Sequence, residues 1–362
     1  MDNVLMKFDV ARQAIAEATS IDEVKQIRDK AEAVRLYVKQ QGESLEMQNE
    51  IATIKLRAER KAGELLAEIE RVENGKSPSS VDEPTYTEIL KNNGLSYGSA
   101  DRWQKIATLP EETFEEVIEE TKAKGGEVTS AGMLRKAKEF NREEKRQEEI
   151  EQGADVEMPA YIAQVYHSEF QGVDIDYQSI DIILTDPPYP QKYLHLYKDL
   201  AEHATHWLKP GGLLAVMCGQ SYLPDILALM TPHIDYHWTI AYLTPGGQSA
   251  QLWQRNVNTF WKPILVFSNG DYTGDWFGDV AKSQPNDNDK RFHEWGQSIS
   301  GMYDLVERLS KPGQIVLDPF MGSGSTGVAA LALQRHFIGI DCDEDNVNIA
   351  RSRLAQVENG SS

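Results

Sequence analysis

Residues 182–190, IILTDPPYP, end an apolar run with one carboxylate, two prolines and an aromatic ring. Prolines stop strands because they lack the N–H group that a ladder needs, so the simplest interpretation is a strand followed by a stiff turn. The same residues could also do chemistry. The carboxylate of Asp186 and the carbonyl of Pro187 are two rigidly held acceptors, which can hold the two N–H bonds of an amine. Tyr189 adds a flat ring on which a planar group can stack.

A second stretch whose residues could take part in chemistry is 314–343, QIVLDPFMGSGSTGVAALALQRHFIGIDCD. A strand leads through Asp318 into a turn with Gly322 and Gly324, and a second strand ends in Asp341. Such a turn lets the backbone approach a ligand, and an acid that ends the next strand can hold two ribose hydroxyls. Asp318 would repel a pyrophosphate and attract an ammonium or a sulfonium. The stretch therefore predicts a site for a cationic nucleoside.

Together, the DPPY turn and the later DPFMGSGST loop resemble the S-adenosylmethionine-dependent DNA amino-methyltransferases. Their order, catalytic motif first and cofactor loop last, resembles the permuted group called beta, and the resemblance covers roughly residues 158–357. It implies S-adenosylmethionine as cofactor, double-stranded DNA as partner and the N6 amine of adenine in a specific sequence as acceptor. Cytosine N4 is the alternative acceptor, because DPPY is only more typical of adenine enzymes, and RNA is a lesser alternative target.

The chemistry of amine methylation suits the four predicted catalytic residues, Asp186, Pro187, Pro188 and Tyr189. An exocyclic amine is a poor nucleophile because its lone pair is delocalised into the ring of the base. Two acceptors on its N–H bonds favour a pyramidal nitrogen whose lone pair points at the methyl donor. An extruded base can stack on Tyr189, and orientation of this kind supplies much of the rate.

The resemblance also implies a set of cofactor-binding residues, with two departures from the family pattern. HEWGQS at residues 293–298 stands where the family usually has His-Pro-Thr-Gln-Lys-Pro, so Gln297 has a counterpart but the Lys-Pro is absent. Residues 165–169, VYHSE, stand where relatives often carry Gly-Asp near the cofactor adenine. No metal ligand is predicted. The predicted cofactor-binding residues are Asp318, Pro319, Phe320, Gly322, Ser323, Gly324, Ser325, Thr326, Asp341, Cys342 and Gln297.

Two cysteines bear on the chemistry and on the compartment. A methyltransferase acting on the cytosine ring would need a cysteine nucleophile. Cys218 lacks a preceding proline and Cys342 adjoins the ribose acid, so both are predicted to be small buried residues. Two cysteines cannot form a disulfide framework, which favours a reducing cytoplasm. The chain shows no secretory signal and no apolar run long enough to span a bilayer.

The elements that position these motifs follow from the periodicity of the second half of the chain. Short apolar strands alternate with helices from about residue 158, which predicts an α/β, Rossmann-like methyltransferase fold with a mostly parallel, seven-stranded sheet. Such sheets bind ligands at the carboxyl ends of their strands, where Asp186 falls. The predicted strands are 161–166, 181–185, 213–218, 237–243, 263–267, 315–318 and 336–341, and the predicted helices are 194–208, 223–230, 299–309, 324–333 and 344–354.

The first half is predicted to be all-α. Residues 1–75 favour a helical hairpin or short coiled coil, in which Ser20 and Glu23 have the form of a capping box and Gly42 interrupts the helix. The hairpin could pair with a second copy of the chain, giving a homodimer, or pack within its own chain. The apolar stripe of its first helix is Val24, Ile27, Ala31, Val34 and Val38.

Residues 76–140 resemble the helix-turn-helix modules attached to phage and plasmid proteins, with an ordinary helical hairpin as the alternative. A helix at 86–92, a turn at 93–95 and a second helix through Ala107 give the motif its spacing. Residues 141–157 favour a solvated helix end and linker before the methyltransferase domain at 158–362. The candidate DNA-facing residues are Tyr97, Ser99, Arg102 and Lys105.

Residues 244–298, between the two motifs, form the predicted target-recognition region. Amides and arginine read base edges, and aromatic rings stack or wedge. A polar loop with buried tryptophans is the alternative. The candidates are Gln248, Gln251, Trp253, Gln254, Arg255, Asn256, Asn258 and Trp261.

The net charge of −20 opposes a nucleic-acid partner, because a local basic surface would have to overcome the repulsion of phosphates. Three functions stay open: a DNA methyltransferase, a DNA-binding regulator with a decayed methyltransferase domain, and an interaction protein that contacts no nucleic acid. The intact DPPY turn and glycine loop favour the enzyme. The recognition sequence, the oligomeric state and any partner nuclease cannot be predicted from these residues.

Overall fold

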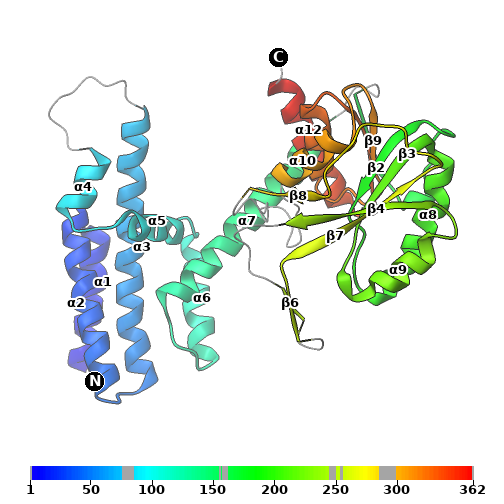
Figure 1. The fold of residues 1–362 in the computed structure, drawn as a ribbon. Helices are drawn as coiled ribbons and strands as arrows, with labels where there is room; N and C mark the ends of the chain where they lie inside the picture. The colour runs from blue at the N-terminus through cyan, green and yellow to red at the C-terminus, as the bar shows by residue number, and fades with distance from the viewer. Residues whose placement is uncertain are drawn as a thin grey trace. The chain divides into compact units, whose positions relative to one another are not determined.

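The computed structural model describes residues 2–75, 85–154, 156, 162–243, 250–252, 256–284 and 299–360. The chain divides into two compact units, Met1–Glu144 and Lys145–Ser362 (Figure 1). The first unit is helical, and the second is built around a large sheet. None of the described helices combines the length and the apolarity that crossing a membrane requires.

The first unit contains six complete helices and the start of a seventh within its described residues. Helix α2 begins after Ser20, whose hydroxyl accepts the N–H of Glu23 at 3.3 Å. The Glu23 carboxylate accepts the N–H of Thr19 instead of that of Ser20, so the cap departs from the predicted capping box. Helix α1 has no counterpart among the predicted helices. The bounds are α1 Asp2–Glu17, α2 Ile21–Gln40, α3 Leu45–Gly75, α4 Tyr86–Asn92, α5 Tyr97–Ala107, α6 Glu111–Ala123 and α7 Ser130–Ala154.

Helices α2 and α3 form the predicted hairpin. Val24, Ala31 and Val38 of α2 are buried as predicted, but Val34 is 49% exposed. The apolar face that meets α3 is therefore narrower than the stripe predicted from the sequence. Whether the hairpin also pairs with a second chain stays a prediction.

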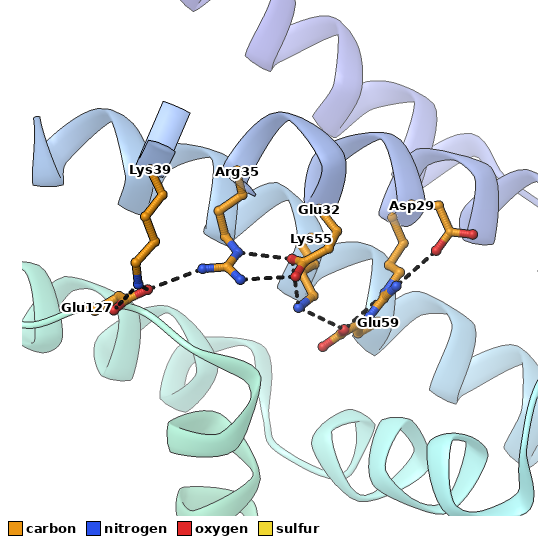
Figure 2. Close-up of polar contacts among 8 residues, drawn as sticks. Asp29, Glu32, Arg35, Lys39, Lys55, Glu59 and Glu127 are labelled. Carbon is orange, nitrogen blue, oxygen red and sulfur yellow. Dashed lines mark hydrogen bonds and ion pairs between the residues drawn. The ribbon is translucent and has the colours of Figure 1, made fainter. Parts of the chain in front are cut away.

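A network of charged residues ties the two helices of the hairpin to the segment that precedes α7 (Figure 2). The Glu59 side chain on α3 is 2% exposed and accepts from Arg28 at 3.2 Å. Glu32 lies between Arg35 and Lys55, and its hydrogen bond from Arg35 is the largest cause that lowers its pKa to about 2. The network comprises Arg28, Asp29, Glu32, Arg35, Lys39, Lys55, Glu59 and Glu127.

Helices α4 and α5 have the bounds and the turn of the predicted helix-turn-helix. Ser96 caps α5 by accepting the N–H of Ser99 at 3.1 Å. Trp103 of α5 is buried against α3, where a Cβ added to Gly63 would lie 2.1 Å from the Trp103 carbonyl oxygen. The close approach of the two helices therefore depends on Gly63 lacking a side chain. DNA binding by this motif stays a prediction.

The second unit is an α/β fold around an eight-stranded sheet with the order β1-β10-β9-β2-β3-β7-β4-β8. All pairs are parallel except β3 with β7 and β7 with β4, so β7 alone runs against the other strands. The mostly parallel Rossmann-like class is confirmed. The strands are β1 Ala163–His167, β2 Ile180–Thr185, β3 Leu208–Met217, β4 Asp235–Leu243, β7 Trp261–Ser268, β8 Val280–Lys282, β9 Ile315–Asp318 and β10 His336–Asp341.

Three short strands among the described residues of the second unit have no counterpart among the predicted strands. Strand β8 raises the count from the predicted seven to eight, and β5 (Ala250–Leu252) pairs with β6 (Val257–Thr259) in a separate two-stranded sheet. Each of these strands has three residues, which is too short for an alternating pattern to be recognised in a sequence.

Helices cover both faces of the sheet because neighbouring strand residues point to opposite sides. Ile182 and Leu184 belong to a core with α10 (Ile299–Leu309), α11 (Ser325–Ala332) and α12 (Glu344–Gly360). Ile183 belongs to a second core with α8 (His195–Trp207) and α9 (Leu223–Met230). Figure 1 shows α8 and α9 in green and α10 and α12 in orange to red.

The later part of α7 belongs to the second unit and packs on α12. Arg146 pairs with Asp345 at 2.8 Å, and the hydroxyl of Ser352 donates to the buried carboxylate of Glu149 at 2.7 Å. A Cβ added to Gly153 would lie 1.8 Å from the carbonyl oxygen of Asn348. Of the predicted helix end and linker at 141–157, residues 141–154 are helical, and Arg146, Glu149 and Gly153 contact α12.

Candidate active site

The two motifs meet at the carboxyl edge of the sheet. Strands β2 and β9 are parallel neighbours, with Ile183 opposite Leu317, so Asp186 follows one strand at the edge where Asp318 ends the other. Strand β10 lies beyond β9 and ends in Asp341. The three acids therefore lie at the carboxyl ends of neighbouring strands, and this edge is where open α/β sheets bind ligands.

Asp318 is a buried carboxylate held by three donors. Its side chain accepts from the Thr185 and Thr326 hydroxyls at 2.7 Å each and from the backbone N–H of Phe320 at 3.1 Å. Burial is the largest cause that raises its pKa to about 6; the hydrogen bonds act against that rise, and the nearby charge of Asp186 adds to it. Both oxygens are therefore engaged within the chain, and contact between Asp318 and a ligand stays a prediction.

The glycine-rich turn between β9 and α11 adopts backbone conformations that L side chains rarely take. Gly322 has φ +49° and Gly324 has φ +79°. A Cβ added to Gly324 would also lie 2.9 Å from the side chain of Ala350 on α12. The Asp341 carboxylate fixes the turn from the next strand by accepting the Gly322 N–H at 2.9 Å. Ser323, Ser325 and Thr326 of the same segment are buried, and their contact with a cofactor stays a prediction.

Arg353 supports the glycine turn from α12, and it is not among the predicted site residues. Its guanidinium donates to the carbonyl and hydroxyl of Ser323 and reaches the Ser325 hydroxyl at 3.4 Å. The residue is only 6% exposed. The contact could not be predicted from the sequence, because Arg353 comes 30 residues after Ser323 and meets it only through the packing of α12.

The DPPY turn forms a short internal contact. The hydroxyl of Tyr189 donates to Oδ1 of Asp186. Burial is the largest cause that raises the pKa of Tyr189 well above its usual value, and the Asp186 charge adds to this rise, so the hydroxyl stays a donor. Pro187 is buried and Pro188 half-buried behind the turn. The ring of Tyr189 lies 5.3 Å from the ammonium of Lys262, measured to the ring centroid.

The two cysteines differ in their surroundings. Cys218 is buried after β3, and burial raises the pKa of its thiol to about 12. Cys342 is exposed, so the prediction that it is buried is wrong; it follows the last residue of β10, where the chain leaves the sheet. The pKa of its thiol is raised by partial burial and then by Asp341. Neither thiol has the lowered pKa of an activated nucleophile.

The residues around the glycine turn fit S-adenosylmethionine better than a dinucleotide. The charges near Cys342 are the carboxylates of Asp341, Asp343 and Glu169, which would repel a pyrophosphate and tolerate a cationic nucleoside. Oδ1 of Asp341 accepts from the N–H of Asp343 and from the side-chain amide of Asn346, whereas Oδ2 accepts the N–H of Gly322 and keeps a lone pair with which a ribose hydroxyl could still be held. At the expected Gly-Asp position, His167 and Glu169 are exposed at the end of β1.

Part of the predicted target-recognition region lies outside the described residues, including Gln297 and His293 and the candidates Gln248, Trp253, Gln254 and Arg255. Of Gln251 only the backbone, in β5, is described. Asn256 and Asn258 are exposed at β6, and Trp261 is 38% exposed. Phe260, which is not among the predicted candidates, is 71% exposed.

The second part of the chain resembles known DNA methylases in sequence. Residues 298–352 match the family model N6_N4_Mtase, described as DNA methylase. The second unit is similar to this family. That match spans α10, the glycine-rich turn and the first half of α12.

Two curated proteins and one solved structure extend the comparison. Type II methyltransferase M.HinfI of Haemophilus influenzae is 38% identical over 69 residues, which are 19% of each chain. Type II methyltransferase M.BglII of Bacillus subtilis is 26% identical over 251 residues, 54% of this chain and 69% of that protein. The crystal structure of the M1.HpyAVI–SAM complex is 21% identical, covers 53% of this chain and 99% of its own, and has a TM-score of 0.46. This chain thus spans about a fifth of M.HinfI and about two thirds of M.BglII.

Proposed function

We propose that the chain is a DNA methyltransferase that transfers a methyl group from S-adenosylmethionine to the N6 amine of adenine. The observation that carries the proposal is the adjacency of the DPPY turn and the glycine turn at the ends of β2 and β9. An amine held at Asp186 would lie next to a donor held at the glycine turn, which in-line transfer requires. The order of the two motifs supports the beta group, and DPPY supports adenine.

The chain's own residues would supply orientation and charge, while the cofactor supplies an activated methyl group on sulfur. Asp186 and the Pro187 carbonyl accept the two N–H bonds of the target amine, and the Tyr189 ring stacks on the extruded base. The Tyr189 hydroxyl fixes the Asp186 carboxylate. After transfer the nitrogen carries one proton too many, and Asp186 is the acceptor in contact with it.

The cofactor would be held by the turn that Asp341 and Arg353 support. Gly322 and Gly324 bring the backbone close to the ligand, and Asp341 takes the ribose hydroxyls. Thr326 fixes the start of α11 by its hydrogen bond to Asp318 of β9, which also accepts from Thr185 at the end of β2. Gln297 belongs to the same proposed set.

The first unit would contribute a DNA-binding arm through α4 and α5. The exposed residues of α5 include Tyr97 and Arg102, while Lys105 pairs with Asp101 at 2.8 Å. Non-specific affinity from this surface should be small, because Arg102 is the one cation on α5 without a carboxylate partner among the described residues. The arm and the region 244–298 would share target selection.

Nucleoside mass spectrometry tests the proposal directly. Purified protein is incubated with S-adenosylmethionine and plasmid DNA from a host without DNA methyltransferases, and the DNA is hydrolysed to nucleosides. N6-methyladenine is expected, and Asp186→Ala should lower its rate of formation by about 10²–10³ or more. N4-methylcytosine alone would overturn the adenine assignment. No methylated nucleoside from protein that binds the cofactor would overturn the enzymatic proposal.

A further inference from the structure

Two lysines lie beside the DPPY turn at the carboxyl edge of the sheet. Lys192 belongs to the short helix η2, Gln191–Tyr193, that begins directly after Pro190. Lys262 is the second residue of β7, which runs antiparallel to β3 and so begins where β3 ends. The N–H of Cys218, just past β3, donates to the Pro263 carbonyl at 3.2 Å, which fixes this junction.

Neither lysine has a carboxylate partner among the residues that the structure describes. Each ammonium lies over an aromatic ring instead: Lys262 is 5.3 Å from the centroid of Tyr189, and Lys192 is 4.6 Å from that of Tyr193. Five other cations among the described residues of the same unit are instead matched by acids. The matched pairs are Arg146–Asp345, Lys198–Glu202, Lys209–Asp181, Arg308–Asp304 and Lys311–Asp275.

The second unit is strongly acidic, so a cation without a carboxylate partner matters for binding DNA. Residues 145–362 hold 15 Lys and Arg against 28 Asp and Glu. A DNA backbone is repelled by most of such a surface, and it can approach only where cations are not already neutralised by neighbouring acids. Lys192 and Lys262 are cations of this kind at the edge of the candidate active site.

An ammonium over a ring is held weakly at an exposed site, by about 0.5–1 kcal/mol. A phosphate is the stronger partner, because it adds the attraction of a full opposite charge. The base that stacks on Tyr189 brings its own sugar and flanking phosphates to the carboxyl edge of the sheet. The flexible side chain of Lys262 can therefore turn from the Tyr189 ring to this backbone, and that of Lys192 can turn to it from the Tyr193 ring.

We propose that Lys262 and Lys192 bind the backbone phosphates that flank the extruded nucleotide. The inference rests on the proposed methyltransferase function and adds the residues that hold the nucleotide's backbone. Lys262 and Lys192 are positioning residues: they contact the phosphates, and the base reaches Asp186 in the correct orientation as a result. Binding the phosphates costs only the free energy of the two ammonium–ring contacts, because no other group has to move.

The salt dependence of the reaction separates a phosphate contact from a structural role. We would measure kcat/KM on unmethylated plasmid DNA with tritiated S-adenosylmethionine at salt concentrations from about 50 to 200 mM. The variants are Lys262→Gln, Lys192→Gln and Lys262→Arg. Lys198→Gln is the matched control, because Lys198 is an exposed lysine of the same unit that pairs with Glu202 at 3.5 Å. Calorimetry with S-adenosylmethionine checks that each variant keeps its cofactor site.

Each glutamine variant at the active-site edge should lower kcat/KM and reduce the slope of log kcat/KM against log salt by about 0.9, the value for one phosphate contact. Lys262→Arg should keep the wild-type slope, and so should Lys198→Gln. If Lys262→Gln slows the reaction with an unchanged slope, Lys262 only supports the ring and the inference is wrong. An equal loss of slope in Lys198→Gln would also overturn it. A wild-type protein that methylates no DNA would refute the proposed function itself.

Discussion

The hydroxyl of Thr185 donates a hydrogen bond of 2.7 Å to the buried carboxylate of Asp318. Thr185 is the last residue of β2 and immediately precedes Asp186, whereas Asp318 ends β9 and opens the glycine turn. One hydrogen bond thus joins the two motifs, which lie 133 residues apart in the sequence. Because both groups are buried, water cannot replace the bond, and the spacing of the two motifs depends on it.

The buried Asp318 should make stability fall as the pH rises from about 4 to about 6. Its pKa of about 6 in the folded chain lies above the ordinary value of 3.8, so the folded chain keeps this proton where the unfolded chain has lost it. The loss should be on the order of 3 kcal/mol, complete above pH 6. Asp318→Asn should remove this component. Urea unfolding of both proteins at several pH values measures it, and parallel stability curves would contradict the prediction.

Tyr189→Phe should separate stacking from the orientation of Asp186. The phenylalanine ring keeps a face for the base, but the hydrogen bond to the Asp186 carboxylate is lost. A hydrogen bond to a charged group contributes about 1.5–3 kcal/mol, so kcat should fall roughly 10- to 100-fold with little change in the KM for DNA. Tyr189→Ala should also raise that KM. Steady-state kinetics that cannot distinguish the two variants would refute the separate role of the hydroxyl.

Arg353→Ala should weaken cofactor binding although Arg353 lies beneath the turn. The variant removes the donors that hold the carbonyl and hydroxyl of Ser323, and it leaves that buried carbonyl without its guanidinium. A loss of about 1.4 kcal/mol or more corresponds to at least a tenfold rise in the Kd for S-adenosylmethionine.

Arg351→Ala is the control for this effect. Arg351 is the neighbouring arginine on α12, and it contacts the Val165 carbonyl at 3.4 Å instead of the turn. Calorimetry should find its Kd within about twofold of wild type. Equal Kd values for the Arg353→Ala variant and the wild-type protein would show that the turn keeps its shape without the guanidinium.

Most helices and strands of the second unit can be predicted from the sequence, because their apolar periodicity and the Gly and Pro residues that end them lie within a few neighbouring residues. Helices at 223–230 and 299–309 and the strand at 336–341 have the predicted bounds. The prediction fails where distant packing decides. The exposure of Val34 and of Cys342, the contact of Arg353 with Ser323 and the position of Lys262 beside Tyr189 each depend on elements far away in the sequence.

Gly63→Ala should displace α5 and so test the packing of the proposed DNA-binding arm. The new Cβ would lie 2.1 Å from the Trp103 carbonyl oxygen and 2.9 Å from the Gln104 nitrogen, both backbone atoms that cannot turn aside. Helices α3 and α5 must then separate, at a cost of about 1–3 kcal/mol. Hydrogen exchange of α5 should become faster, while exchange in the second unit stays unchanged.

Gly98→Ala is the matched control on α5 itself. A Cβ at Gly98 meets nothing within 4 Å, and alanine favours a helix over glycine by up to about 1 kcal/mol. This variant should therefore leave exchange in α5 equal or slower, whereas Gly63→Ala makes it faster. If both variants accelerate exchange alike, α5 is sensitive to any added side chain, and close contact at Gly63 is not what holds it in place.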